Sequence, residues 1–194
     1  MGLREVKEWL NPMQKDEIIK LVGDLYKRNK QVQEYLDFMV KPNEAEIHNL
    51  YREKLIYAFT STRKKKISLK EAKKAITDLK KFNPKPEYVA DLMMLYVEKG
   101  IDLYISYGYG DSDYFYSIGN TLFEALKYMG KYNIEEIFYE RLRKIYDLSM
   151  DVGYGFYDTV IDLYGNFLSD DFYDEDDHEE STVGKAIVFE LPKK

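Results

Sequence analysis

Apolar residues recur every three or four positions along most of this 194-residue chain. The clearest stripe lies at 134–146, where they stand at i, i+3, i+4, i+8, i+11 and i+12. This spacing places the apolar side chains on one face of an α-helix, and such a face is expected to pack against a core. The chain is therefore predicted to be all-α. The same period returns at 18–26, 32–39, 47–51, 115–129 and 156–168.

Capping residues mark where several of these helices should begin. Ser68, Asn43 and Asn133 are each followed three residues later by Glu, which is the pattern of a capping box. The two prolines within 83–86 should end the preceding helix, because proline has no backbone N–H to donate. The segment 88–104 is apolar on nearly every side, so we expect it to form a central, buried helix.

Short connections between about eight helices indicate antiparallel neighbours within one helical domain, residues 1–169. The architecture is either an irregular bundle or a short HEAT-like array of helical hairpins. Two Gly-Tyr-Gly turns, at 108–110 and 153–155, lie 45 residues apart, and HEAT repeats are roughly 40–47 residues long. In the first turn, glycine should close the preceding helix in a left-handed conformation, and Asp111 or Asp113 should cap the next helix. The second turn fits the same account.

The formal charge of −6 comes entirely from the C-terminal end, because residues 1–169 hold 26 basic and 26 acidic side chains. Residues 170–182, with eight acids among the first eleven positions, are predicted to be a flexible, acidic linker in a non-helical tail. Residues 183–194 are predicted to be a short docking segment with an apolar, β-branched centre and an extended conformation. A lone strand should dock on its own body, a second copy or a partner. The candidate interaction residues of this tail are Asp174, Asp176, Asp177, Ile187 and Phe189.

The segment 61–85 carries the opposite charge to the tail, because it holds ten Lys or Arg and only two acids. Three interpretations stay open for it: a solvated helix face, a phosphate-binding surface, or a docking surface for the acidic tail in cis or from a second subunit. Nucleic acid is the less favoured partner, because the chain lacks a nucleic-acid motif and its pI is about 5.1. The candidate ridge residues are Arg63, Lys64, Lys65, Lys66, Lys70, Lys73 and Lys74.

The sequence offers no catalytic set and predicts no cofactor or metal. It has no cysteine, which excludes disulfides, thiolate metal sites and cysteine nucleophiles. His48 and His178 belong to no metal-binding pattern, and we expect His48 on a helix surface or near a cap. The acids at 174–177 lack the glycine of an EF-hand loop. The longest apolar run, 92–97, is far shorter than the roughly 20 residues of a membrane helix, so we expect a cytoplasmic protein without membrane association.

These patterns favour a non-enzymatic protein-interaction module that uses the Lys-rich ridge, the tyrosine-rich second half and the acidic tail. A protein partner or self-association is expected. The alternative is a small-ligand binder or an enzyme, with a pocket between helices lined by tyrosines and by carboxylates such as Asp91, Asp158 or Asp162.

Three segments, 69–79, 88–100 and 153–164, resemble a family of small, all-helical bacterial proteins of unknown function. The resemblance covers roughly residues 3–168 and leaves the tail outside. It implies a helical, cytosolic bacterial protein. It implies no activity, cofactor or catalytic residue.

Overall fold

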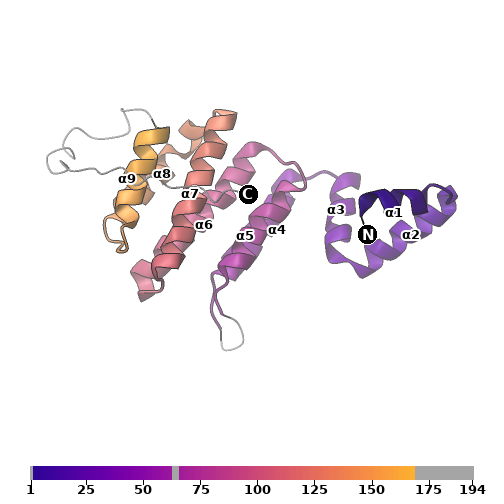
Figure 1. Ribbon diagram of the computed structural model, residues 1–194, viewed down its shortest axis with the longest axis horizontal. Helices are drawn as coiled ribbons and strands as arrows, with labels where there is room; N and C mark the ends of the chain where they lie inside the picture. The colour runs from indigo at the N-terminus through magenta and orange to yellow at the C-terminus, as the bar shows by residue number, and fades with distance from the viewer. Residues whose placement is uncertain (1, 63–65, 169–194) are drawn as a thin grey trace.

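The computed structural model of the protein describes residues 2–62 and 66–168 (Figure 1). Within these residues there are nine α-helices, one short 3-10 helix and no β-sheet, which confirms the all-α prediction. The elements are α1 Leu3–Leu10, α2 Lys15–Arg28, α3 Lys30–Val40, α4 Glu44–Ala58, α5 Leu69–Lys80, α6 Pro86–Tyr107, α7 Ser112–Tyr132, η1 Glu135–Phe138, α8 Tyr139–Ser149 and α9 Phe156–Phe167.

Two of the three predicted capping residues begin helices as expected. The Asn43 side chain accepts a hydrogen bond from the Glu46 N–H at the start of α4, and the Ser68 hydroxyl accepts one from the Glu71 N–H at the start of α5, each at 3.2 Å. The prediction for Asn133 was wrong. It ends α7 in the left-handed conformation, with φ of 52°, a position that asparagine tolerates after a helix.

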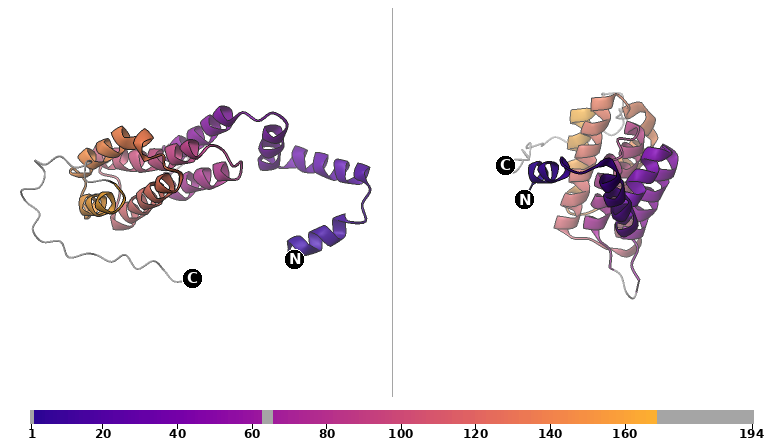
Figure 2. Two further views of the ribbon diagram at one scale, coloured as in Figure 1. Left: turned by 90° about the horizontal axis from the view of Figure 1, so that it is seen from above. Right: turned by 90° about the vertical axis from the view of Figure 1, so that its right-hand side faces the viewer.

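Helices α4 to α9 pack as consecutive pairs. α4 contacts α5, α6 contacts α7 and α8 contacts α9, while α4, α6 and α8 also contact one another in that order. Figure 1 shows the pairs side by side, and Figure 2 shows the same row from above and from one end. The arrangement is that of stacked helical hairpins, and the row of α4, α6 and α8 forms one layer of it.

Helix α6 is the central element of this stack, as its apolar sequence predicted. It contacts α4, α5, α7 and α8, and ten of its 22 residues are buried. It lies close against α7 at Gly100, where an added Cβ would overlap the side chain of Ile118. Ile118 itself has no exposed surface, so the absence of a side chain at position 100 lets the two helices meet.

The two Gly-Tyr-Gly turns lie together at one end of the stack. Gly108 ends α6 with φ of 62°, and the Asp111 carboxylate then accepts a hydrogen bond from the Tyr114 N–H, as predicted. In the second turn, the Tyr154 ring stacks on the Phe115 ring with centroids 5.6 Å apart. Aromatic packing therefore joins the start of α7 to the turn that precedes α9.

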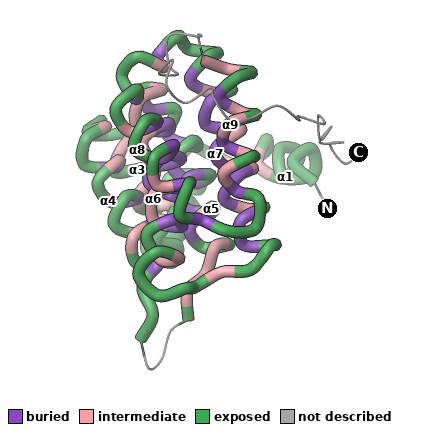
Figure 3. Tube along the Cα trace, turned by 90° about the vertical axis from the view of Figure 1, so that its left-hand side faces the viewer, coloured by how far each residue is buried: buried purple, intermediate pink, exposed green. Residues whose placement is uncertain are grey.

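The first three helices differ from the expectation that their apolar stripes face a core. None of them contains a buried residue, and the core begins at Ile47 in α4. Figure 3 shows the buried positions within the stacked helices of the body and the exposed course of α1. We call α1–α3 the N-terminal arm and α4–α9 the body. The arm is anchored through α3, whose Phe38 ring meets the Phe82 ring edge-on at 5.3 Å and whose Glu34 carboxylate pairs with Lys54 at 2.9 Å. α1 and α2 project away from the body (Figures 1 and 2).

The predicted linker 170–182 and docking segment 183–194 lie outside the described residues. So do the following interaction candidates: Arg63, Lys64, Lys65, Asp174, Asp176, Asp177, Ile187 and Phe189.

Candidate functional site

A groove crosses the layer formed by α4, α6 and α8. It encloses about 440 Å³. Its apolar lining comes from all three helices, and charged side chains from the same helices surround that lining. We call it the α4–α6–α8 groove, and it is lined by Arg52, Ile56, Leu95, Glu98, Lys99, Asp102, Arg141, Lys144, Ile145 and Leu148.

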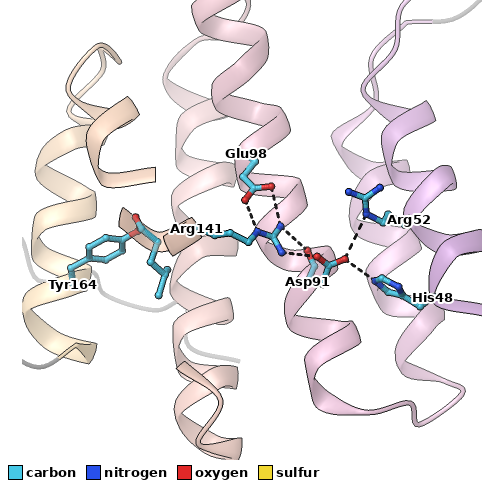
Figure 4. Close-up of polar contacts among 7 residues, drawn as sticks. His48, Arg52, Asp91, Glu98, Arg141 and Tyr164 are labelled. Carbon is cyan, nitrogen blue, oxygen red and sulfur yellow. Dashed lines mark hydrogen bonds and ion pairs between the residues drawn. The ribbon is translucent and has the colours of Figure 1, made fainter. Parts of the chain in front are cut away.

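A network of charged side chains beside the groove ties its three helices together (Figure 4). Asp91 of α6 lies at the centre. Its Oδ2 accepts a hydrogen bond from His48 Nε2 of α4 at 2.7 Å, and its Oδ1 accepts one from Arg141 Nη1 of α8 at 2.5 Å. Arg52 of α4 approaches Oδ2 at 3.8 Å. Both carboxylate oxygens are thus engaged by the neighbouring helices.

Arg141 is also held by a second carboxylate, which lies seven residues, or about two turns, further along α6. Its Nε and Nη2 donate to the two oxygens of Glu98 at 2.6 and 2.9 Å, a two-pronged geometry that fixes the guanidinium plane. From the other side, the Tyr164 hydroxyl of α9 donates to the Leu142 carbonyl of α8 at 2.8 Å. The helix that carries Arg141 is therefore braced on both sides.

Electrostatics keep the pair formed by Asp91 and Arg141 charged. Burial alone would raise the pKa of Asp91, but the hydrogen bond from His48 and the charge of Arg141 outweigh it and hold that pKa below its usual value. Burial likewise opposes the charge on Arg141, and Glu98 and Asp91 more than compensate, so its pKa is raised. An Asp91 carboxylate held in this way is a poor general base, because its proton affinity is lowered.

Two cations at the groove remain open to a ligand. The Arg52 side chain is 45% exposed, and within residues 2–62 and 66–168 its one ion pair is the long contact to Asp91. Lys144 is exposed and forms no ion pair with any described residue. The apolar surface of the groove comes mainly from the partly buried Ile56 and Leu148, because Leu95 and Ile145 are almost fully buried beneath it. The groove can therefore accept a group that combines negative charge with apolar side chains.

The family of the chain is shown by comparison with known proteins. The sequence model of a family of unknown function, DUF6155, matches residues 1–167. The chain belongs to DUF6155. This membership confirms the expected family of unknown function, and the match ends before the acidic tail. No curated protein and no solved structure matches the chain.

In this DUF6155 protein, some lysines of the predicted ridge are exposed to solvent, and others lie over aromatic rings. Lys70 and Lys74 are exposed on α5. Lys73 is half-buried instead, and its Nζ lies 5.6 Å from the centre of the Tyr96 ring, while burial lowers the pKa of its ammonium group. Lys80 lies over the Tyr128 ring at 5.3 Å in the same way. Lys66 is exposed just before the helix. The exposed positive surface is therefore narrower than the sequence pattern suggests.

The carboxylates predicted for an inter-helix pocket do not converge. Asp91 lies in the network described above, whereas Asp158 and Asp162 are exposed on α9, which contributes no residue to the groove. Among the described residues, no group of three His, Asp or Glu side chains is arranged to hold a metal ion. No helix in the described part of the DUF6155 chain is long and apolar enough to cross a membrane.

Sequence reasoning missed most of the charged network. His48 was expected on a helix surface or near a cap. Instead its side chain is only 13% exposed, stacks on the Tyr88 ring at 4.6 Å and bonds to Asp91. One signal was available: Asp91 and Glu98 stand seven residues apart in a mostly apolar helix, so they share one face and need partners from other helices.

Proposed function

We propose that the protein is a non-enzymatic protein-interaction module whose α4–α6–α8 groove binds an acidic, partly apolar segment of a protein partner. The proposal is carried by the composition of the groove, which combines an apolar lining with two available cations, Arg52 and Lys144. Such a surface suits a segment that presents carboxylates beside apolar side chains.

The acids in the groove argue against a polyanion as the ligand. Glu98 and Asp102 line it together with the cations, so a continuous run of phosphates would meet repulsion as well as attraction. A protein segment can place its carboxylates at Arg52 and Lys144 and its apolar side chains on the apolar lining. The chain's own tail has this composition, and the proposal includes residues 170–194 as one such segment, in cis or from a second copy.

Photo-crosslinking from the groove tests the proposal on the full chain. A photoreactive amino acid replaces Lys144, and a matched chain carries it at Lys127, which is exposed on α7 outside the groove. We expect the Lys144 position to crosslink to acidic protein segments, either of another protein or of residues 170–194, and Arg52→Glu to suppress these adducts. Equal crosslinking from the two positions would contradict the proposal.

A small-ligand binder or enzyme is the second candidate, and the size of the groove favours it. A volume of about 440 Å³ falls within the roughly 300–1,000 Å³ of small-molecule sites. A thermal-shift screen against metabolites and nucleotides tests this candidate, since a ligand that binds only the folded state raises the melting temperature. A hit whose effect disappears in Arg52→Glu would assign the groove to a small molecule.

The proposed setting is the cytoplasm of a bacterium. The cysteine-free composition fits a reducing compartment, and the resemblance noted above supports the bacterial origin. We also propose that the three stacked helix pairs are HEAT-like repeats, with the spacing of the two Gly-Tyr-Gly turns as support.

A further inference from the structure

The N-terminal arm exposes an unusually large apolar surface. Trp9 is 55% exposed, Ile19 57% and Val40 81%, and no residue in α1, α2 or α3 is buried. The large apolar side chains of the arm with substantial exposure are Leu3, Val6, Trp9, Ile18, Ile19, Val22, Leu25, Tyr35, Met39 and Val40.

The shortness of α1 indicates that something covers this surface. The helix has eight residues, whereas isolated helices below roughly 12–15 residues are marginal in water. Its apolar positions Leu3, Val6 and Leu10 follow the helical period, so they present one stripe to a partner. The body does not supply that partner, because α1 and α2 project away from it (Figures 1 and 2).

The charge of the arm matches a second copy of itself. Residues 2–40 contain seven Lys or Arg and seven Asp or Glu, so their net charge is zero. Two such surfaces can meet without net repulsion, whereas a strongly acidic or basic partner would call for an excess of the opposite charge. The acidic tail and the basic segment 61–85 both lack this neutrality.

The size of the surface also fits a dimer. Ten large apolar residues, each 37–81% exposed, are a substantial part of the roughly 20–30 residues that each partner contributes to a standard interface of about 800 Å² per side. A twofold axis would place the same patch on both sides of the contact, as in most homodimers.

We propose that the apolar face of the N-terminal arm is the interface of a homodimer, in which a second copy of the chain presents the same face. The anchor of α3 on the body, through Glu34 with Lys54 and Phe38 with Phe82, sets the direction in which the arm leaves the body. This inference is independent of the groove and of the function proposed for it.

Sedimentation equilibrium of the full chain tests the proposal from low to high micromolar concentration. We expect a species of twice 23.1 kDa that dissociates on dilution. Trp9→Glu and Ile19→Glu should each weaken the dimer at least tenfold, because each replaces a large apolar side chain at the interface with a charge. Neither residue is buried, so the body should keep its melting temperature.

Ile137→Glu is the matched control. Ile137 is 61% exposed on η1, outside the arm, and its substitution should leave the dimer unchanged. A full chain that stays monomeric at every concentration would overturn the proposal, as would dimers that Ile137→Glu weakens as much as Trp9→Glu does.

Crosslinking from a single introduced cysteine identifies what covers the apolar face of the arm, since the natural chain has no cysteine. Val6→Cys treated with a short bis-maleimide should give a covalent product of twice the monomer mass. In a second chain, a photoreactive group at Trp9 should crosslink to residues 2–40 of the other copy. Crosslinks within one copy to residues 183–194 would assign the face to the tail and overturn the dimer.

Discussion

Asp91 joins three helices through its two carboxylate oxygens. His48 of α4 donates to one oxygen and Arg141 of α8 donates to the other, so the side chain of α6 lies between two partners that are 43 and 50 residues away along the chain. Its side chain is 23% exposed, so water only partly screens these contacts. The network is therefore expected to matter for stability as well as for the shape of the groove.

Removing the Asp91 charge should destabilise the fold. Asp91→Asn leaves the half-buried Arg141 with Glu98 as its remaining carboxylate, and we expect a loss of about 2–3 kcal/mol in the free energy of unfolding. Urea unfolding measures it. The control is Asp102→Asn, which breaks the exposed pair with Lys99 and should cost less than about 1 kcal/mol. Similar losses in the two variants would contradict a structural role for the network.

The contribution of Asp91 should depend on pH in a defined direction. Its folded pKa lies below the ordinary pKa of an aspartic acid, so the carboxylate stabilises the folded state at any pH above that ordinary pKa. As the pH falls through the folded pKa, both states become protonated and the contribution disappears. The stability difference between the wild-type chain and Asp91→Asn should thus be full at pH 7 and shrink below about pH 4. A difference that is constant from pH 7 to pH 2 would show another origin.

The individual contacts of this network could not be predicted from the sequence. Helical spacing places Asp91 and Glu98 on one face of α6, and that much is visible from the sequence. The identity of Arg141 and His48 as their partners depends on how α4 and α8 pack on α6, and no local pattern encodes that packing. His48 was assigned to a surface because a lone histidine on a helix carries no signal of a distant carboxylate.

At the scale of elements, the contact between α6 and α7 depends on Gly100. An added Cβ would overlap Cδ1 of the fully buried Ile118 and lie 2.9 Å from its Cγ1. Gly100→Ala should therefore lower the free energy of unfolding by about 1–2 kcal/mol, although alanine favours a helix by about 1 kcal/mol. The matched control is Gly23→Ala in α2, where a Cβ meets nothing within 4 Å and which should be neutral or stabilising.

A double-mutant cycle in urea unfolding separates packing from propensity. Ile118→Val removes the overlapping Cδ1, so Gly100→Ala should cost less in that background than in the wild-type chain. Equal costs in both backgrounds, or a stabilising Gly100→Ala, would show that the helices do not need this close approach.

The beginnings and ends of helices were predictable where a single residue decides them. Ser68 and Asn43 cap the helices that follow, because the side chain and the N–H it accepts from lie three residues apart. Asn133 shows the limit of this reasoning, since asparagine also suits the left-handed end of a helix. The apolar stripe of the 21-residue α7 continues up to Asn133, so this residue ends α7. That stripe is a stronger signal than Glu136, which alone suggested that a new helix begins at Asn133.

At the scale of the whole molecule, the chain consists of a packed body and an exposed arm. The sequence did not separate them, because the stripes at 18–26 and 32–39 have the same period as the stripes of the body. Periodicity shows that a helix has an apolar face and does not show what covers it. In the body other helices of the chain cover these faces, and in the arm we propose that a second copy does.

Hydrogen exchange should distinguish the arm from the body by its dependence on concentration. The amides of α6 lie in the central helix, so their protection should be the same at all concentrations. The amides of α1 should exchange only while the chain is a monomer, because the dimer covers this helix. Once dimers dominate, the fraction of monomer falls as the inverse square root of the total protein concentration. The protection of the α1 amides should then rise about threefold for each tenfold increase in concentration. Trp9→Glu should abolish this dependence and Ile137→Glu should preserve it, whereas α1 amides protected equally at every concentration would mean that the arm is covered within a single copy.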